Sequence, residues 1–577
     1  MYGMKLWWTA SLITLTSACA AGPTVAPGPV AESAPLPADH NGPPEIPAPA
    51  LAISSERMNE IARTLASDPF QGRAPGTEGE GRTVDYLVEQ FKQAGLEPGG
   101  ENGGWTQSVP MIRTQLEGTR IGITQKGQRR NLSVPDDIYV TTVRPVDRAR
   151  IAGAPMVFVG YGVSAPERGW DDFKGVDLKN KVAVFLVNDP DFAAARGDDA
   201  AGKFGGKAMT YYGRWSYKFE EAARRGAIAA LVIHETEAAG YGWNVAGGGG
   251  GENYALADNA GPTPPMLQGW IQGPVFESIV KAAGLNATTL MRRARFKDFR
   301  PVDLRARLSA DASVKVDRIA SRNVIGKLTG RTRPEETVSY GGHWDAYGVG
   351  KPDANGLTIR PGAADDAVGL AAMIEVARLF AAGPRTDRSL IFAAWTGEER
   401  GLLGSEYYAQ HPLYPMSKMA ANLTFDTLQW AGPVKDVVLI GKGQSELETI
   451  MADEASKQGR TVTDESHPER GLFYRADHFS FAKRGVPVLL NMALAGEYEL
   501  VEGGRAAGAK WLSDFTTTCY HQTCDAWTPA WDLRGAVQEA ELFRQIGLRL
   551  ANGGEWPAWR EGSEFAKVRA ESTAERK

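Results

Sequence analysis

The sequence has only three cysteines, no excess of basic residues and no long hydrophobic run after its N-terminal segment. A membrane helix needs ~18 continuous apolar residues, and no later stretch offers them. The formal net charge of -5 and the pI of about 6.0 disfavour a nucleic-acid partner. The 66 glycines and 34 prolines are too dispersed for a fibrous repeat. A length of 577 residues with 43% hydrophobic and 23% charged residues indicates a globular protein with two domains.

The N-terminus has the features of a bacterial-type secretory signal, which we place at residues 1–20. The apolar run Leu6–Ala18 is too short for a permanent anchor and is followed by small residues. A lipobox-like tetrapeptide ends at Cys19, which would then be lipidated, and ordinary cleavage after the neighbouring small residues is the alternative. The Pro- and Ala-rich residues 21–53 are typical of a linker. We therefore expect an exported protein, either periplasmic, an outer-membrane lipoprotein or secreted.

Two cysteines remain for the folded part of the chain. Cys519 and Cys524 are five positions apart in a protein predicted to enter an oxidising compartment. This pattern predicts a local disulfide, which shapes a tight loop more than it restricts the unfolded chain.

The residues from Asn323 onward alternate between strand-like and helix-like patterns, which predicts an α/β domain with a mixed or mostly parallel sheet. Strands are expected at Thr337–Tyr340, Leu390–Trp395, Leu423–Phe425, Val437–Ile440 and Val486–Leu490, with a helix from about Asp366 to Ala382. We assign the main domain to residues 54–140 and 321–560. Residues 141–320 are predicted to be a small β-rich inserted module, and the charged tail 561–577 to be a solvated helix or disordered.

Five short segments carry the residue types that bind metals, and several of them follow a predicted strand. They are Gly341–Asp345 with His343 and Asp345, Gly362–Gly369 with Asp365, Thr396–Leu402 with Glu398 and Glu399, the strand-end Asp426, and Cys519–Asp525 with Tyr520 and His521. Singly, such a histidine is more often packed and such a carboxylate pair more often caps a helix. Together they point to one site, because an α/β domain can place all five at the same sheet edge.

The order of these motifs resembles the co-catalytic dizinc aminopeptidase and glutamate carboxypeptidase family. The resemblance covers the main domain, and the Cys-Tyr-His-x-x-Cys-Asp segment is similar to that of secreted bacterial aminopeptidases. It implies a zinc-exopeptidase (phosphorylase/hydrolase-like) three-layer αβα sandwich with a mixed sheet. The inserted module resembles a protease-associated (PA) domain.

The resemblance also implies two Zn²⁺ ions per chain and a role for each matching residue. His343 and Asp426 would bind one zinc, Glu399 and His521 the other, and Asp365 would bridge the two. Nitrogen and oxygen ligands without thiolate suit a hydrolytic zinc site, and each catalytic zinc needs about three protein ligands. Glu398 would be the general base, Asp345 would orient the His343 ring, and Tyr520 would donate a hydrogen bond to the oxyanion.

These residues predict an aminopeptidase that releases N-terminal residues from peptide substrates. One alternative is trimming of a C-terminal acidic residue, for which Arg475 is a candidate carboxylate clamp. Another is one-zinc glutaminyl cyclisation, and a third is a non-enzymatic binding protein. Asp477 and His478 match a family segment near the site and are interpreted as lining the pocket without binding metal. The oligomeric state is not predicted.

Overall fold

The computed structural model of the chain describes residues 52–247, 250–258 and 261–576. The predicted signal at residues 1–20, including Cys19, and nearly all of the predicted linker 21–53 lie outside the described residues. The described residues, from Ala52 onward, form one compact unit. Within the described ranges, no helix has the length and apolar character needed to cross a membrane.

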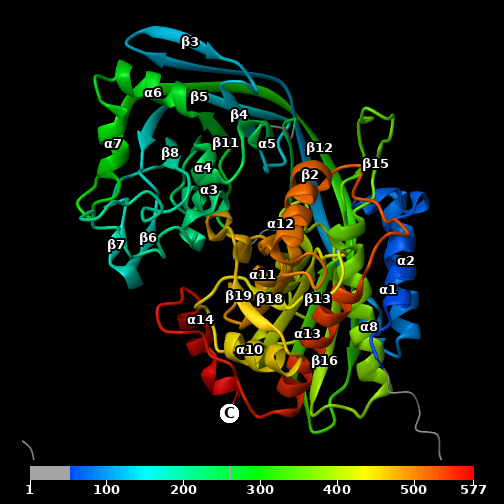
Figure 1. Ribbon diagram of the computed structural model, residues 1–577. Coiled ribbons are helices and arrows are strands. Elements are labelled where there is room, and N and C mark those ends of the chain that lie inside the picture. The colour runs from blue at the N-terminus through cyan, green and yellow to red at the C-terminus, as the bar shows by residue number, and fades with distance from the viewer. Residues whose placement is uncertain (1–51, 248–249, 259–260, 577) are drawn as a thin grey trace, which may run out of the picture. The chain divides into compact units, whose positions relative to one another are not determined.

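One half of this unit is built on a mixed sheet. Its neighbouring strands, in spatial order, are β20 (Val488–Met492), β17 (Met419–Asp426), β13 (Arg333–His343), β16 (Arg388–Trp395) and β12 (Val302–Leu328). β13 pairs in parallel with β16 and β17, and β17 in parallel with β20, whereas β12 is antiparallel to β16 (Figure 1). The predicted α/β fold with a mixed sheet is confirmed.

Side chains of the central strand β16 alternate between two cores, as the twofold period of a strand requires. Leu390, Phe392 and Ala394 belong to one hydrophobic cluster, whereas Ile391, Ala393 and Trp395 belong to another. The first cluster includes side chains from the helices α1 (Ser55–Leu65), α2 (Glu78–Gln93), α8 (Val368–Ala382), α10 (Leu447–Lys457) and α13 (Arg534–Asn552). The second includes side chains from α9 (Leu403–Gln410), α11 (His478–Ala482) and α12 (Gly504–Asp514). Helices therefore cover both faces of the sheet.

The helices that support the site begin where the sequence provides caps. The Ser54 hydroxyl accepts a hydrogen bond from the Arg57 N–H at the start of α1 (3.2 Å), and the Thr77 hydroxyl caps α2. The helix expected from about Asp366 begins at Val368, because residues 363–367 form a separate helical turn in which Asp365 and Asp366 have non-helical dihedrals. This turn frees both carboxylates from the regular helix.

The inserted segment forms the other half of the same sheet. Strands β5 (Arg148–Phe158), β8 (Val182–Leu186), β9 (Ala229–His234) and β11 (Leu267–Gln272) pair in parallel, and β4 (Ile138–Thr141) is antiparallel at the edge. β5 pairs with β12, so fourteen strands of the described chain form one sheet. We call this half the inserted module. Its β-rich character follows the prediction, and its assignment as a PA domain stays a prediction.

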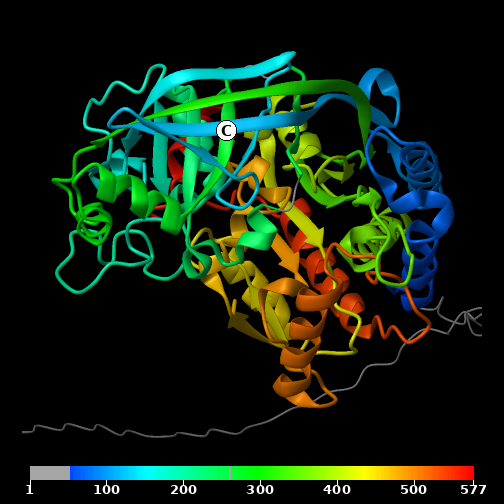
Figure 2. The same cartoon turned by 90° about the horizontal axis from the view of Figure 1, so that it is seen from above.

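Two long strands join the halves. β2 (Thr106–Gln125) and β12 pair antiparallel from Ala306 opposite Gln125 to Val324 opposite Thr106, and Figure 2 shows them running side by side across the molecule. Leu116 and Ile123 of β2 lie in the hydrophobic cluster of the module. The module therefore begins before residue 141, and the predicted boundary at 320 falls inside β12.

The charged tail 561–576 is mostly exposed and contains helix, as the solvated-helix alternative predicts, but two of its side chains are buried against the rest of the chain. This segment contains α14 (Ala566–Glu571) and a further helical turn, and the side chains of Phe565 and Arg569 are buried. The Arg569 guanidinium donates a hydrogen bond from Nη1 to the Met419 carbonyl (3.0 Å). The sequence pattern is mostly charged, but a few side chains are enough to attach the tail to the sheet.

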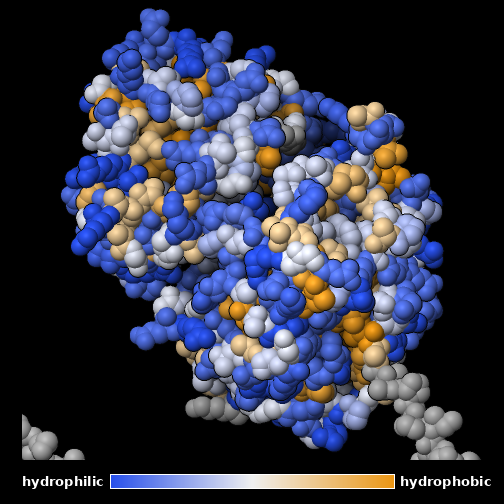
Figure 3. All heavy atoms as spheres, viewed as in Figure 1, coloured by the Kyte–Doolittle hydropathy of each residue, from blue (hydrophilic) through white to orange (hydrophobic). Residues whose placement is uncertain are grey.

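The described surface has few exposed large hydrophobic residues, namely Val134, Val245, Val349, Leu357, Val501 and Val568. Figure 3 shows one face, on which hydrophilic residues dominate and hydrophobic ones are scattered. The remaining labelled elements are β1 (Glu97–Pro98), β3 (Gln128–Leu132), β6 (Ser164–Ala165), β7 (Trp170–Asp171), α3 (Trp215–Arg224), α4 (Thr236–Ala239), α5 (Trp243–Ala246), β10 (Glu252–Leu256), α6 (Gly273–Ala282), α7 (Ala287–Arg293), β14 (Gly348–Val349), β15 (Ile359–Arg360), β18 (Asp436–Leu439) and β19 (Thr461–Asp464).

Candidate metal centre

The structure brings the five predicted metal ligands to one edge of the sheet. His343 is the last residue of β13 and Asp426 the last residue of β17. Glu399 follows the neighbouring β16, where a parallel sheet places its sites. Two further segments complete the group, which we call the ligand cluster: the turn before α8 and the disulfide loop supply Asp365 and His521.

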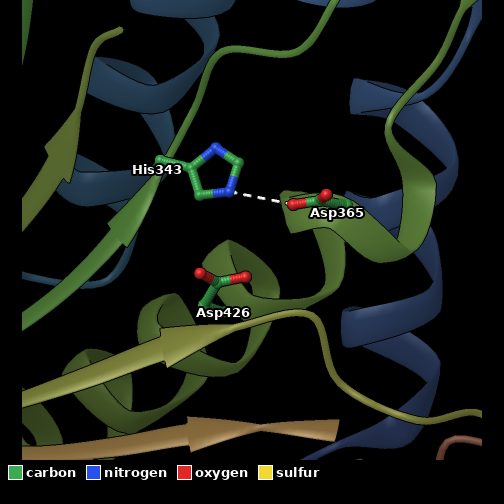
Figure 4. A group of neighbouring side chains, drawn as sticks. All are labelled: His343, Asp365 and Asp426. Carbon is green, nitrogen blue, oxygen red and sulfur yellow. Dashed lines mark hydrogen bonds and ion pairs between the residues drawn. The ribbon is translucent and has the colours of Figure 1, made fainter. Parts of the chain in front are cut away.

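Asp365 lies between the two histidines. Its Oδ1 is 3.0 Å from His343 Nε2 and its Oδ2 is 3.1 Å from His521 Nε2. Two groups of side chains have ligand atoms within 4.8 Å of one another: His343, Asp365 and Asp426, and Asp365, Glu399 and His521. Figure 4 shows the first group, in which both carboxylates converge near the imidazole. One carboxylate thus belongs to both possible metal sites.

The donor set fits zinc. Each group offers three ligands of nitrogen and oxygen, the number that a catalytic zinc takes from protein. The buried Nε2 of His521 makes no hydrogen bond of acceptable geometry, although it lies 3.1 Å from Asp365 Oδ2 and 3.4 Å from Glu399 Oε2. A buried ring nitrogen without a hydrogen bond is uncommon in a protein interior, and a metal ion would satisfy it.

Electrostatic interactions within the cluster oppose one another. Burial raises the pKa of Asp426 to about 7, and the nearby charge of Asp365 adds to this rise. Burial would also raise the pKa of Asp365, but the hydrogen bond from His343 and the adjacent His521 ring outweigh it and hold that pKa well below its usual range. Burial and Asp365 raise the pKa of Glu399 well above its usual value. Buried carboxylates that repel one another in this way favour a bound cation.

Glu398, the predicted general base, is next to the cluster. Its backbone N–H donates to Asp345 Oδ1 (3.0 Å). Burial raises the pKa of its carboxyl well above the usual value, and the charges of Asp426 and Glu399 add to the rise. A raised pKa makes the carboxylate a stronger base, which suits a group that accepts a proton from water and returns it.

Asp345 contacts the His343 ring differently from the prediction. The Nδ1 atom of His343 lies 3.0 Å from the main-chain carbonyl oxygen of Asp345 and 3.9 Å from its carboxylate. The ring is therefore oriented through the backbone of residue 345. The carboxylate instead accepts the Glu398 N–H, so it positions the loop that carries the predicted base.

The other predicted site residues also lie at this edge. The Tyr520 ring packs against the His521 ring with 3.6 Å between centroids, and burial raises the pKa of its hydroxyl well above 10. Asp477 and His478 are buried, and the described structure includes neither in the possible metal groups. Cys519 and Cys524 form the disulfide. The role of Tyr520 as a hydrogen-bond donor to the oxyanion stays a prediction.

Sequence reasoning missed two residues that hold the Asp365 loop. Asp525 accepts hydrogen bonds from the Ala364 N–H (2.8 Å) and the Asp365 N–H (3.2 Å). The fully buried Arg73 donates to the carbonyls of Leu65, Trp344, Pro361 and Gly362 at 2.6–2.9 Å. Asp525 was visible in the disulfide-loop motif, but nothing in the turn-rich Gly72–Thr77 segment identifies the partners of Arg73.

Asp366, to which the sequence assigned no role in the site, connects three segments around the cluster. Its Oδ2 accepts the His343 N–H (3.3 Å), and its Oδ1 accepts the N–H groups of Gly369 (3.1 Å) and Thr427 (3.0 Å). One carboxylate thereby joins the ends of β13 and β17 to the start of α8. It fixes the spacing of three segments that carry cluster residues.

A site with two groups of nitrogen and oxygen ligands sharing one carboxylate, at the carboxyl edge of a mixed sheet, defines a metallohydrolase class of centre. Residues 323–543 match the sequence model "Peptidase family M28". This match confirms the family resemblance found from the motifs, and it covers all five residues of the ligand cluster.

Two fungal proteins are similar to part of the chain. A "Probable zinc metalloprotease" of Pyrenophora teres f. teres is 36% identical over 103 residues, which is 18% of this chain and 22% of that protein. The same description applies to a protein of Pyrenophora tritici-repentis, 35% identical over 103 residues and matched over 23% of its length. The chain thus spans less than a quarter of the length of these relatives.

Solved structures of low sequence identity align over most of the chain. An aminopeptidase from Aneurinibacillus sp. strain AM-1 is 18% identical, with a TM-score of 0.45 and coverage of 87% of this chain and 95% of that one. A zinc aminopeptidase from Bacillus subtilis is 16% identical, with a TM-score of 0.43 and coverage of 89% and 98%. With TM-scores of 0.45 and 0.43, these structures add nothing to the fold described above, which is taken from this chain alone.

Proposed function

We propose that this chain is a zinc-dependent exopeptidase, an aminopeptidase that uses two zinc ions per chain. The observation that carries the proposal is the ligand cluster, in which Asp365 belongs to both possible metal groups. The M28 match and the zinc metalloprotease description of the fungal relatives support the reaction class. The Cys519–Asp525 disulfide loop, which is similar to that of secreted bacterial aminopeptidases, supports the preference for the N-terminus over the alternatives.

The residues of the chain would divide the work as follows. His343, Asp365 and Asp426 would hold one zinc, and Asp365, Glu399 and His521 the other. When bound, zinc supplies Lewis-acid chemistry that polarises the carbonyl and makes water acidic near neutral pH.

Glu398 would accept the proton of the attacking water and return it to the leaving amine, since burial keeps its pKa high. Tyr520, whose neutral hydroxyl remains protonated, would donate a hydrogen bond to the developing oxyanion.

The direct test is hydrolysis of aminoacyl-p-nitroanilides with free and N-acetylated amines, before and after metal removal. We expect turnover only with the free amine, loss after chelation and recovery with zinc. Metal analysis should give two zinc ions per chain. Equal rates on blocked substrates would remove the aminopeptidase assignment, and one zinc per chain would favour glutaminyl cyclisation instead.

Glu398→Gln tests the proposed base. We expect kcat to fall by roughly a hundred- to ten-thousandfold, the usual contribution of general acid–base catalysis, with zinc content unchanged. Glu406→Gln is the control, because Glu406 forms ion pairs with Lys483 and Arg484, which follow α11, and lies outside the ligand cluster. Near-normal turnover by Glu398→Gln would refute its role.

We also propose that the protein is exported by its N-terminal signal, with Cys19 as the candidate lipid attachment. The support is the sequence pattern alone, since these residues lie outside the described ranges. Mass spectrometry of the mature N-terminus in a bacterial host tests it. A mature protein that begins at Met1 would contradict export, and an unmodified residue other than Cys19 at the N-terminus would contradict lipidation.

A further inference from the structure

The strand β10, which belongs to the inserted segment 141–320, packs beside the loop 398–400 of the main domain. β10 pairs antiparallel with β2. A small hydrophobic cluster of side chains that includes Met111, Leu256 and Leu403 joins these two strands to the start of α9. Tyr254 of β10 is half-buried and packs against this cluster. The inserted segment thus reaches the part of the chain that carries the predicted base and one predicted metal ligand.

Arg400, the residue after the predicted ligand Glu399, contacts two tyrosine rings. Its guanidinium carbon lies 5.1 Å from the centroid of the Tyr254 ring and 4.9 Å from the centroid of the Tyr347 ring. Among the residues that the structure describes, none forms an ion pair with Arg400, and its buried Nε–H has no acceptor. A cation within about 6 Å of a ring centroid is attracted by the ring, more strongly where water is excluded. The two rings therefore hold the guanidinium in place.

The second of these rings reaches the ligand cluster. The centroids of the Tyr347 and His521 rings are 4.5 Å apart. Tyr347 also lines a cavity together with Glu399 and His521. A row of contacts thus runs from β10 through Arg400 and Tyr347 to one of the two possible metal groups, the one that contains Glu399 and His521. The other possible metal group shares only Asp365 with it.

We propose that Tyr254 and Arg400 are positioning residues for the zinc site of Glu399 and His521. This inference rests on the proposed zinc peptidase function and gives the inserted segment a role in it. Tyr254 holds the guanidinium of Arg400, and the guanidinium restrains both the loop of Glu399 and the Tyr347 ring. That ring in turn restrains the His521 imidazole. Both residues act through other side chains, as groups that orient metal ligands from behind do.

The affinity of each of the two zinc ions tests this role without catalysis. EDTA-treated protein is titrated with zinc in the presence of a colorimetric chelator. We expect Tyr254→Ala and Arg400→Gln each to weaken one zinc ion by roughly ten- to hundredfold, the usual effect of losing a group that orients a metal ligand, and to leave the other largely unchanged. Tyr254→Phe keeps the ring and should bind both ions as the wild type does. Arg400→Lys keeps the charge without the planar group and should restore part of the affinity.

Tyr407→Ala is the matched control. Tyr407 is also half-buried and packs against the same small hydrophobic cluster, but its ring lies on His411, with 4.6 Å between centroids. We expect its zinc affinities to equal those of the wild type. Equal weakening in Tyr407→Ala would mean that general packing, and not the contact with Arg400, determines the affinity, and would overturn the proposal.

The double variant Tyr254→Ala/Arg400→Gln tests whether the two residues act in one row. If Tyr254 acts through Arg400, the double variant should bind zinc no more weakly than Arg400→Gln alone, whereas independent effects would add. Thermal unfolding of the zinc-free proteins checks the fold of each variant. Unchanged zinc affinity in both single variants, a loss that Tyr254→Phe does not rescue, or additive losses in the double variant would overturn the proposal.

Hydrolysis of alanine-p-nitroanilide by the zinc-saturated proteins keeps this inference separate from the proposed function. If the zinc affinities follow the expected pattern but the zinc-loaded wild type cleaves no aminoacyl substrate, the proposed function fails and the positioning role stands. If the wild type cleaves the substrate and all variants bind both zinc ions alike, the positioning role is wrong and the proposed function stands.

Discussion

Asp525 shows how a residue with no place in the ligand cluster determines the position of one that has. Both oxygens of its carboxylate are occupied by backbone N–H groups, one of them belonging to Asp365. Burial raises the pKa of Asp525 to about 7. The hydrogen bond from the Ala364 N–H opposes this rise, and the charge of Asp365 adds a smaller increase. The carboxylate is thus removed from solvent, and its two hydrogen bonds fix the position of Asp365, the ligand that both possible metal sites share.

We expect Asp525→Ala to lower zinc affinity by roughly ten- to hundredfold, the usual effect of removing a group that orients a metal ligand. Competition with a chromophoric chelator measures it. Asp532→Ala is the control, because Asp532 is a partly exposed residue paired with Arg534 on the helix α13. An unchanged zinc affinity would mean that Arg73 alone is sufficient to hold the loop.

His478 gives a prediction for pH dependence. Its Nε2 donates to the Phe473 carbonyl (2.7 Å), and burial lowers its pKa from 6.5 to about 3. In the unfolded chain the imidazole becomes protonated below pH 6.5, whereas in the folded chain it stays neutral down to about pH 3. The free energy of unfolding is therefore unaffected by this histidine above pH 6.5 and decreases as the pH falls from 6.5 to about 3.

His478→Gln keeps a donor for the carbonyl and removes the titration. Between pH 7 and pH 5, we expect the melting temperature of the variant to fall less steeply than that of the wild type. For one titrating group, the corresponding difference in the free energy of unfolding is at most about 1.4 kcal/mol per pH unit. His411→Gln, at an exposed position, should leave the slope unchanged. Parallel curves for wild type and His478→Gln would show that another group dominates acid sensitivity.

At the scale of elements, the periodic patterns of apolar residues predicted the existence of strands and helices, which local sequence determines. The expected strand Leu390–Trp395 lies within β16, because its alternating side chains serve two cores. The ends of elements were less accessible: α8 starts after the predicted Asp366, since tertiary hydrogen bonds hold that carboxylate in a turn. The burial of Phe565 and Arg569 in the tail was missed because both depend on partners distant in sequence.

The disulfide loop carries both Tyr520 and His521, so its covalent closure should matter more for the site than for the fold. We expect Cys519→Ser/Cys524→Ser to lose zinc and most of kcat, because His521 occupies a left-handed backbone conformation with φ 63°. Closing so small a loop contributes about 2 kcal/mol at most. Thermal unfolding and metal analysis of the double variant test this, and a large drop in melting temperature with zinc retained would contradict it.

At the scale of the whole molecule, the two halves cannot be separated at the boundaries that the sequence indicated. Residue 320 lies inside β12, and the module's core includes Leu116 and Ile123 of β2. Composition signals where a segment changes character, whereas strand pairing over long sequence separations decides where a domain ends.

We expect a chain from which residues 141–320 are excised and replaced by a short Gly/Ser linker to be insoluble or unfolded, because β2 would lose most of its pairing with β12. Circular dichroism and size-exclusion chromatography of the excised chain measure this. A linker inserted at Gly127, in the exposed turn between β2 and β3, is the control that keeps all pairings. A folded, monomeric excised chain would show that the main domain is autonomous.

The uninterrupted course of β12 has a mechanical consequence. Its 27 residues pair with strands of both halves, with register shifts such as the one between Asp311 and Ser313, so a rotation of one half against the other must disturb the hydrogen bonds of one strand. In the described chain, the two halves are thus joined by paired strands and not by a single-stranded linker. Peptides should therefore enter and leave through rearranging side chains and short loops, and catalytic turnover should be insensitive to solvent viscosity.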